Sequence, residues 1–351
     1  MKIAVFLPNW LGDLVMATPT LRAMRKHFGP DTEIVGIMRP YLGDLLAGTD
    51  WLSEQWYFNP RGKDPALGGR SLVRRMRERR FDMTVLLTNS LRTGILAWLG
   101  GARERIGYAR YGRGPLLTGK LYPHREGRRV LEDPVVDTYL SLASAVGCPD
   151  ESRQLELATT GADQQSAERV WRELGIRDDG QVIALNSSGA YGSAKLWPIE
   201  HFAQLARQIN DRLHHDVLVM CGPKEREIAR RVAELSGGSR VYSMADQPMD
   251  LGTAKACMQR ARLMVSSDSG PRHVAAALYK PVVTLFGPIL PTPSENPTQR
   301  AVNIVLDLDC IGCHKRVCPL KHHRCMRDIT VDRVYGEVAK LIEEQRQTRA
   351  A

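Results

Sequence analysis

The residues in this chain most capable of chemistry are polar side chains that directly follow short apolar runs. The clearest case is the segment SSDSG at 266–270, which follows the apolar residues 263–265 and precedes a helical pattern near Pro271. Backbone N–H groups at such a helix start, together with the helix dipole, favour a bound phosphate. The same segment could instead be an ordinary connection in which Ser269 or Asp268 caps the helix.

A carboxylate and a lysine occupy comparable places elsewhere in the chain. Asp13 follows the apolar run 2–7, and the segment NSSG at 186–189 with Lys195 follows the run 181–186. A carboxylate can accept the proton of an attacking hydroxyl, while a lysine and a helix start can stabilise a departing phosphate. The pattern therefore suits group transfer from a donor with a phosphate leaving group. Asp13 could alternatively serve only as the cap of the helix that begins near Leu14.

Four of the seven cysteines fall within sixteen residues, at positions 310, 313, 318 and 325, with three histidines among them. This spacing is typical of a zinc or iron–sulfur site, so a structural zinc ion on Cys310, Cys313, Cys318 and Cys325 is one interpretation. Reduced thiols in an irregular loop are the other. Because the strand and helix series is complete without this cluster, we expect no required cofactor.

The elements that must position these residues alternate between strand and helix. Strand patterns at 2–7, 33–38 and 83–87 alternate with helical patterns at 14–28, 71–80 and 135–146. After a lapse in periodicity at 154–163, a second such series extends from residue 166 to about 286. Alternation of this kind predicts parallel sheets covered on both faces, and ligands bind beyond the carboxyl ends of such strands. We therefore expect an α/β protein with two doubly wound, Rossmann-like domains facing across a cleft.

Length and charge limit the possible functions. A chain of 351 residues predicts two domains, with 43% hydrophobic and 25% charged residues. The N-terminal segment lacks the pattern of a signal peptide, and no apolar run approaches the length of a membrane span, so we expect a cytoplasmic protein. The net charge is +10, and residues 66–129 contain fifteen Lys and Arg against four acids. Such a region attracts anionic lipid or a phosphorylated substrate, whereas interleaved aromatics typical of a nucleic-acid module are not evident.

Three motifs carry a resemblance to a known family. They are PNWLGDLVMATPTLRAM at 8–24, SSGAYGSAKLWPIEHFAQLA at 187–206 and SSDSGPRHVAAALYKPVVTLFGP at 266–288. In order and spacing they resemble the family 9 glycosyltransferases, the ADP-heptose:lipopolysaccharide heptosyltransferases, especially those of the heptosyltransferase II type. The resemblance implies a GT-B fold, with an acceptor-binding domain at 1–160 and a nucleotide-sugar domain at 161–330. A C-terminal helix at 331–351 is then expected to return to the first domain.

The resemblance also implies residue roles. Asp13 corresponds to the proposed general base of inverting transfer, and Lys195 to a lysine near the donor phosphates. Other donor-binding positions implied in the same way are Ser187, Ser188, Asp268, Ser269, Gly270 and His273, with Glu225 and Met249 near the nucleoside. His273 could instead be a buried core histidine.

The resulting expectation is a peripheral enzyme of the inner membrane that moves heptose from ADP-heptose to a phosphorylated lipopolysaccharide-core acceptor. One alternative is a family 9 transferase that uses another nucleotide sugar and another glycan. A second alternative, of a different class, is a non-catalytic binding module in which the Cys/His cluster docks a partner or nucleic acid.

Overall fold

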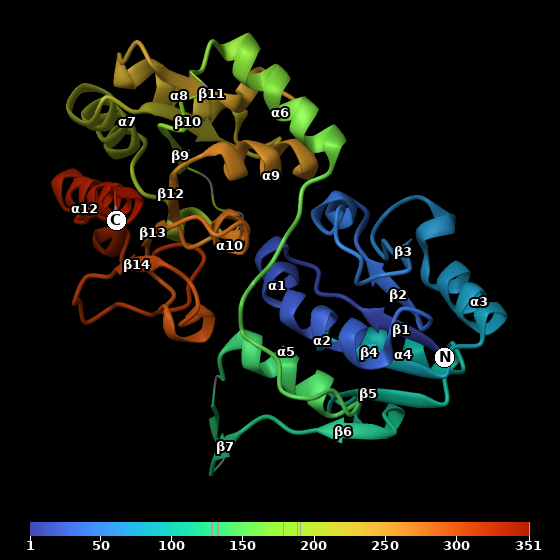
Figure 1. Ribbon diagram of the computed structural model, residues 1–351. Helices are drawn as coiled ribbons and strands as arrows, with labels where there is room; N and C mark the ends of the chain where they lie inside the picture. The colour runs from blue at the N-terminus through green and yellow to red at the C-terminus, as the bar shows by residue number, and fades with distance from the viewer. Residues whose placement is uncertain (128, 132, 178, 188, 190, 351) are drawn as a thin grey trace. The chain divides into compact units, whose positions relative to one another are not determined.

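The chain folds into two compact units (Figure 1). The computed structural model describes residues 1–127, 129–131, 133–177, 179–187, 189 and 191–350. The first unit comprises Met1–Ala158 and Pro293–Thr298, and the second comprises Thr159–Thr292 and the chain from Gln299 onward. The observed division after Ala158 is two residues before the expected one. The return of Pro293–Thr298 to the first unit was not expected from the sequence.

The first unit is built on a six-stranded parallel sheet with the order β3-β2-β1-β4-β5-β6. Its buried strands β1 and β4 read as near-continuous apolar runs because both faces are covered. The more polar strands β3, β5 and β6 lie toward the edges and escaped the sequence prediction. The strands are β1 (Lys2–Phe6), β2 (Glu33–Met38), β3 (Glu54–Tyr57), β4 (Met83–Leu86), β5 (Glu104–Tyr108) and β6 (Gly119–Leu121).

Two groups of helices cover the faces of this sheet. Helices α1 (Leu11–Met16), α2 (Thr18–Phe28) and α5 (Val135–Ser144) pack together in one layer, and α3 (Gly69–Arg79) packs with α4 (Leu91–Leu99) in the other. The predicted single helix at 14–28 is thus two helices that meet at Ala17. Pro19, in the first turn of α2, has no N–H for the helical ladder, which explains the break.

The second unit repeats the same topology, with the strand order β11-β10-β9-β12-β13-β14, again all parallel. Its strands are β9 (Val182–Asn186), β10 (Asp216–Met220), β11 (Val241–Ser243), β12 (Leu263–Ser267), β13 (Val282–Leu285) and β14 (Ala301–Ile304). Its main helices are α6 (Gly161–Leu174), α7 (Ile199–Gln208), α8 (Arg226–Ser236), α9 (Leu251–Arg260), α10 (Gly270–Ala277) and α12 (Val331–Ala350).

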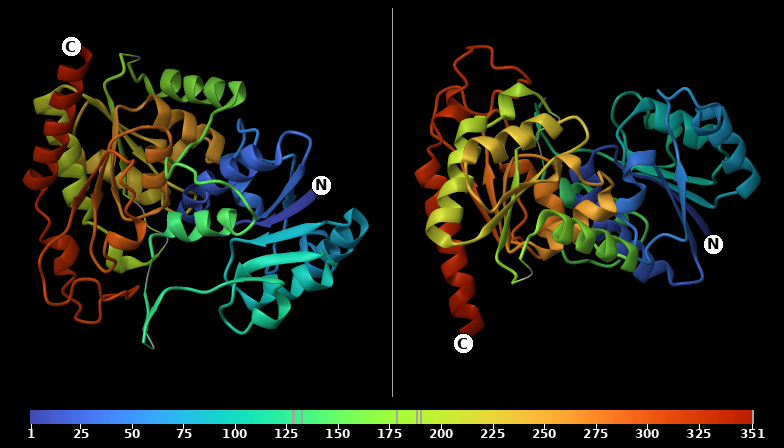
Figure 2. Two further views of the ribbon diagram at one scale, coloured as in Figure 1. Left: turned by 60° about the horizontal axis from the view of Figure 1, so that its bottom comes forward. Right: turned by 90° about the horizontal axis from the view of Figure 1, so that it is seen from above.

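The C-terminal helix corrects one expectation. Helix α12 does not return to the first unit but packs on the second, against α7 and β13 (Figure 2). Val334, Val338 and Ile342 are buried in the same apolar core as the strands of that unit. The amphipathic pattern predicted the helix correctly, but not which sheet it covers. In the ranges that the structure describes, none of the helices is long and apolar enough to cross a membrane.

Candidate active site

The candidate residues gather at one place in each sheet, the point where the strand order reverses. In the first unit this point lies between β1 and β4, and in the second between β9 and β12. Loops from the two central strands leave there in opposite directions, which opens a crevice at the carboxyl edge of the sheet. Asp13 follows β1, whereas Lys195 and Asp268 follow β9 and β12. The predicted base, Asp13, and the predicted phosphate-binding residues, Lys195 and Asp268, therefore each lie at the edge of a sheet where doubly wound folds bind ligands.

Asp13 lies in a pocket of about 420 Å³ in the first unit. The pocket lining combines polar and aromatic side chains from the loops after β1, β4 and β5 with residues at and near α5. Among them are Asp13, Asn89, Tyr108, Arg110, Asp133 and Tyr139. This mixture provides hydrogen-bonding groups for a polar ligand beside the half-buried carboxylate.

Burial dominates the electrostatics of Asp13. Desolvation raises the pKa of its carboxyl to about 6, from a usual 3.8. Its negative charge in turn contributes, after burial, to raising the pKa values of Tyr41 and Tyr139. The alternative role as helix cap is wrong, because Trp10 is the N-cap of α1 and Asp13 is its third residue, with no side-chain capping bond. Asp13 is thus a half-buried carboxylate whose pKa suits proton transfer near neutral pH.

A fully buried arginine lies beside this pocket and was not predicted. The guanidinium of Arg113 donates to the carbonyl of Tyr108 at 2.8 Å, to Oδ1 of Asn89 at 2.9 Å and to the carbonyl of Thr88. Arg113 therefore ties the loop after β4 to the loop after β5. Burial, reinforced by the charge of Arg110, lowers its pKa to about 10, so the side chain stays cationic at neutral pH. Nothing in the spacing of the sequence distinguishes Arg113 from its many basic neighbours.

The second unit holds a buried triad of alternating charge. Lys195 Nζ forms an ion pair with Oδ2 of Asp268 and donates to its backbone carbonyl at 3.1 Å. Nε of Arg272 lies 3.1 Å from the other oxygen, Oδ1 of Asp268. Two cations thus flank one carboxylate, which leaves a net positive charge at the start of α10. That charge adds to the helix dipole and favours an anionic ligand. The structure brings together the predicted Lys195 and Asp268, and adds Arg272.

The turn before α10 differs in detail from its prediction. Ser269 is the N-cap of α10, but its hydroxyl makes no capping bond and instead accepts from Nδ2 of Asn186 at 2.9 Å. Gly270, and not Pro271, is the first helical residue. Ser187 is buried, and its hydroxyl has no hydrogen-bond partner within the described chain. The predicted partner Ser188 lies outside the described residues.

His273 is buried in α10, with 4% of its surface exposed. Desolvation, followed by the positive charges of Arg272 and Lys195, lowers its pKa well below the usual value, so the imidazole is neutral at pH 7. Nδ1 has no partner among the described residues. The prediction of a phosphate contact is untested, and it would require a neutral imidazole N–H donor rather than a cation.

Glu225 and Met249 remain predictions. Glu225 follows β10 and is the N-cap residue of α8, while Met249 is half-buried in the loop between β11 and α9. Both follow strands on one side of the reversal point, at the same edge as Lys195.

Residues of the cysteine-rich segment contact the loop that follows β9 and carries Lys195. Tyr191 Oη donates to the carbonyl of His314 at 2.8 Å, and the centre of the Tyr191 ring lies 4.6 Å from Lys195 Nζ and 5.3 Å from Arg316 Cζ. Ala194 N donates to the carbonyl of Arg316 at 3.1 Å. At Gly192, with φ of +153°, a Cβ atom would lie 2.4 Å from the same carbonyl oxygen, so only glycine permits this approach. The segment therefore helps to position Lys195.

The cysteines themselves are free thiols in the part of the chain that the structure describes. Burial, followed by the electrostatic effect of Cys310, Cys313 and Cys318, raises the pKa of Cys325 to about 11, which places the four thiols in one neighbourhood. No group of three or more His, Cys, Asp or Glu side chains among the described residues is arranged to hold a metal ion. The zinc interpretation of the four cysteines therefore stays an untested prediction.

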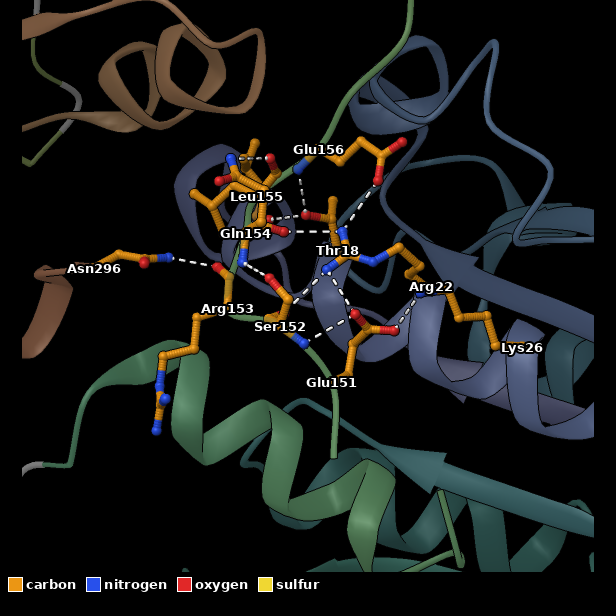
Figure 3. A network of polar contacts seen from close by, with 11 residues as sticks. Thr18, Arg22, Lys26, Glu151, Ser152, Arg153, Gln154, Leu155, Glu156 and Asn296 are labelled. Atoms are coloured by element: carbon orange, nitrogen blue, oxygen red, sulfur yellow. Dashed lines mark hydrogen bonds and ion pairs between the residues drawn. The ribbon is translucent and has the colours of Figure 1, made fainter. Parts of the chain in front are cut away.

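The chain that leaves the first unit is tied to helix α2 (Figure 3). Arg22, which is 9% exposed, donates to the carbonyls of Gln154 at 2.9 Å and Ser152 at 3.0 Å, and also pairs with Glu151 and Glu156. Asn296, in the segment that returns to this unit, donates to the carbonyl of Arg153 at 2.7 Å. Arg22 lies within the first motif but was not predicted to have a role.

Comparisons with known proteins agree with this geometry. The sequence pattern of "Glycosyltransferase family 9 (heptosyltransferase)" matches residues 69–324. Lipooligosaccharide heptosyltransferase 2 of Campylobacter jejuni (serotype O:6) is 26% identical over 97% of this chain and 99% of that protein. Lipopolysaccharide heptosyltransferase 2 of Escherichia coli K12 is also 26% identical, over 98% of this chain and 100% of that protein.

In structure, the chain is similar to the E. coli ADP-heptose lps heptosyltransferase II, with a TM-score of 0.79, 24% identity and coverage of 99% of this chain and 100% of that one. This match confirms the expected GT-B fold class of two doubly wound α/β units. Because the family pattern covers most of the chain, this protein is a glycosyltransferase that belongs to family 9, the heptosyltransferase family.

Proposed function

We propose that this protein transfers heptose from ADP-heptose to the phosphorylated inner core of a lipopolysaccharide precursor, with inversion at the anomeric carbon. The names of the relatives from C. jejuni and E. coli support the reaction, and the name of the structural neighbour supports the donor. The observation that carries the mechanism is the half-buried Asp13 carboxyl, whose pKa of about 6 lies close to the pH of the cell interior. The alternative of a non-catalytic binding module is set aside, because family 9 is a family of transferases.

Asp13 acts as the general base in this proposal. The acceptor hydroxyl oxygen attacks the anomeric carbon of heptose while its proton passes to the Asp13 carboxylate. The bond between the anomeric carbon and the phosphate oxygen breaks, and ADP departs with the electron pair. Attack from the side opposite to the leaving group inverts the configuration. At pH 7 a carboxyl with a pKa of about 6 is roughly nine-tenths ionised, so most molecules hold the active form.

Lys195, Arg272 and the start of α10 stabilise the departing diphosphate. An ammonium group has three N–H donors, and the described contacts of Lys195 use two of them, both on Asp268. The third donor and the net positive charge of the triad are available to a phosphate oxygen. Because the triad is buried, its charges are less screened than they would be in water. The hydroxyl of Ser187, which is buried and without a described partner, is a further donor for the diphosphate.

The identity of the nucleotide is tested by thermal unfolding of the purified protein with ADP, UDP or GDP at equal concentration. A ligand that binds only the folded state raises the unfolding midpoint by mass action, and a ligand at 100 times its Kd contributes about 2.7 kcal/mol. We expect a shift with ADP alone. A shift with UDP or GDP alone would instead support the alternative of a family 9 transferase with another nucleotide sugar.

The cellular site follows from the acceptor. We propose that the enzyme acts at the cytoplasmic side of the inner membrane as a peripheral protein, with no nucleic-acid partner, because its acceptor is a phosphorylated glycolipid. The excess of basic residues at 66–129 supports this placement, since a positive surface is attracted to anionic lipid headgroups.

A further inference from the structure

Helix α4 presents an apolar stripe to solvent. Leu91, Ile95 and Trp98 are 45%, 39% and 54% exposed, and their i, i+4, i+7 spacing aligns them on one face of the helix. The opposite face of α4 packs into the first unit through Leu96 and Ala97. A helix that is apolar on both faces buries only one of them within its own unit, so the second face is suited to an apolar partner.

Helix α3 presents a stripe of positive charge beside it. Arg70, Arg74 and Arg77 are exposed with the same i, i+4, i+7 spacing. The other arginines of α3 are engaged elsewhere: Arg75 lies over the Trp56 ring, and Arg79 pairs with Glu33 and Glu54. Within the positive stripe, Arg77 also joins α3 to α4, because its Nε donates to the carbonyl of Leu99 at 2.7 Å, and it remains exposed.

A groove of about 470 Å³ lies between α3 and α4, on the side of α4 that carries Leu96 and Leu99. Its apolar lining comes from Val73, Leu96 and Leu99, and the three arginines Arg70, Arg74 and Arg77 also line it. The only carboxylate among the described residues of the groove is Glu78, which lies 3.8 Å from Nε of Arg74. An apolar groove with a positive border matches a molecule that has an acyl chain and an anionic headgroup.

We propose that this α3–α4 face, formed by Arg70, Arg74, Arg77, Leu91, Ile95 and Trp98, docks the enzyme on an anionic membrane. Tryptophan and leucine enter the boundary between headgroups and acyl chains, while arginines contact the phosphate groups. A second copy of the chain fits this face less well, because two-fold pairing would bring two positive stripes together. The proposal rests on the proposed function in one respect: a glycolipid acceptor requires an enzyme at the membrane surface.

The experiment is co-sedimentation of the full-length protein with vesicles of equal parts phosphatidylglycerol and phosphatidylethanolamine, and with vesicles of phosphatidylcholine alone. The wild type is expected to bind the anionic vesicles, with weaker binding as salt increases. The triple variant R70Q/R74Q/R77Q should lose roughly fivefold in affinity per arginine, or on the order of 100-fold. The double variant I95S/W98S should lose about tenfold or more, because less apolar area enters the membrane.

Matched controls separate this face from general effects of charge and hydrophobicity. The triple variant R169Q/R172Q/R231Q removes three exposed arginines of the second unit, and L235S/Y279S removes two exposed apolar residues of the same unit. Both should bind vesicles within a few-fold of the wild type. All variants should unfold near the wild-type temperature, which excludes loss of structure as the cause.

Two results would overturn the proposal. One is that the face variants bind anionic vesicles as tightly as the wild type. The other is that the wild type binds no vesicles but forms an oligomer that I95S/W98S dissociates, which would assign the face to a second copy. Heptose transfer to a water-soluble core oligosaccharide is measured in parallel. If the proposed function is wrong, the wild type shows no such transfer. If only the membrane-docking inference is wrong, the wild type still catalyses this transfer.

Discussion

Replacement of Asp13 by asparagine should abolish catalysis and at the same time stabilise the protein. Burial raises the pKa of Asp13 from 3.8 to about 6, so the ionised carboxyl is less stable in the folded chain than in the unfolded one. A difference of about two pKa units, at 1.36 kcal/mol each, corresponds to about 3 kcal/mol. Below pH 4 the carboxyl is protonated in both states and the cost vanishes. The cost grows as the pH rises from 4 to 6 and is complete above pH 6.

The assay compares thermal unfolding of the wild type and Asp13→Asn from pH 4 to pH 8. The variant should gain up to about 3 kcal/mol at pH 8, which is several degrees for a unit of this size, and almost nothing at pH 4. The matched control Asp31→Asn removes an exposed carboxylate of the same unit and should show no such pH dependence. A loss of stability at pH 8, or a difference that does not change with pH, would refute the assignment of Asp13 as a desolvated carboxylate.

The kinetic half of this prediction uses the same variant. Loss of a general base should lower turnover by roughly 10²–10⁴. For the wild type, kcat/KM should fall about tenfold per pH unit below pH 6, because protonation of Asp13 removes the base. Turnover of Asp13→Ala or Asp13→Asn within about threefold of the wild type would show that Asp13 is not the base.

Three further predictions follow from other parts of the two sites. Lys195→Ala should raise the KM for the sugar donor and weaken ADP binding. The control Lys224→Ala, which replaces an exposed lysine at another strand end of the same unit, should change neither quantity. An unchanged KM for the sugar donor in Lys195→Ala would exclude a contact between Lys195 and the donor phosphates. Arg113→Met should destabilise the first unit by about 2–5 kcal/mol, because it leaves the acceptor oxygens of Thr88, Asn89 and Tyr108 without their donor. Denaturant unfolding of this variant at the wild-type midpoint would contradict the prediction. In thiol titration at pH 8, the partly exposed thiols of Cys310, Cys313 and Cys318 should react quickly. Burial raises the pKa values of four other thiols to about 11 or 12 and should make their reaction slow; these are Cys148, Cys221, Cys257 and Cys325. Equal reaction rates for all seven thiols would contradict the described burial.

The sequence predicted those features that depend on neighbouring residues. The apolar run 263–265 and the small residues after it predicted β12, the turn and α10, because strand, turn and helix signals are all local. The two βα series predicted two doubly wound units in the same way. The edge strands β3 and β6 were missed because EQWY and GKL are short and polar, and a strand exposed on one side lacks a continuous apolar pattern.

Helix α4 was also missed, although a signal was present. Ser90 is its N-cap and accepts from the N–H of Thr93, which is the expected role for a serine before an apolar run. Because LRTGILAWL has apolar residues on more than one face of the helix, it showed no clear amphipathic period. The same property now identifies the exposed stripe on α4.

The buried cations Arg22, Arg113 and Arg272 could not be predicted from the sequence. Arg22 and Arg113 are held by acceptors from segments far along the chain, such as Gln154 for Arg22, whereas Arg272 pairs with Asp268 only four residues before it. Charge in a sequence indicates an exposed side chain by default, and only the fold shows where several acceptors meet. For the same reason the placement of α12 was wrong: its apolar face predicts a helix that packs, but not on which sheet.

The central claim is inverting transfer of heptose from ADP-heptose with Asp13 as the base, and its most direct test is the product itself. The purified enzyme is incubated with ADP-heptose and a lipopolysaccharide precursor that lacks the heptose, and the product is examined by mass spectrometry and NMR. We predict a gain of one heptosyl group with inverted anomeric configuration and release of ADP, and no product from Asp13→Asn. Retention of configuration, or transfer only from another nucleotide sugar, would contradict the account.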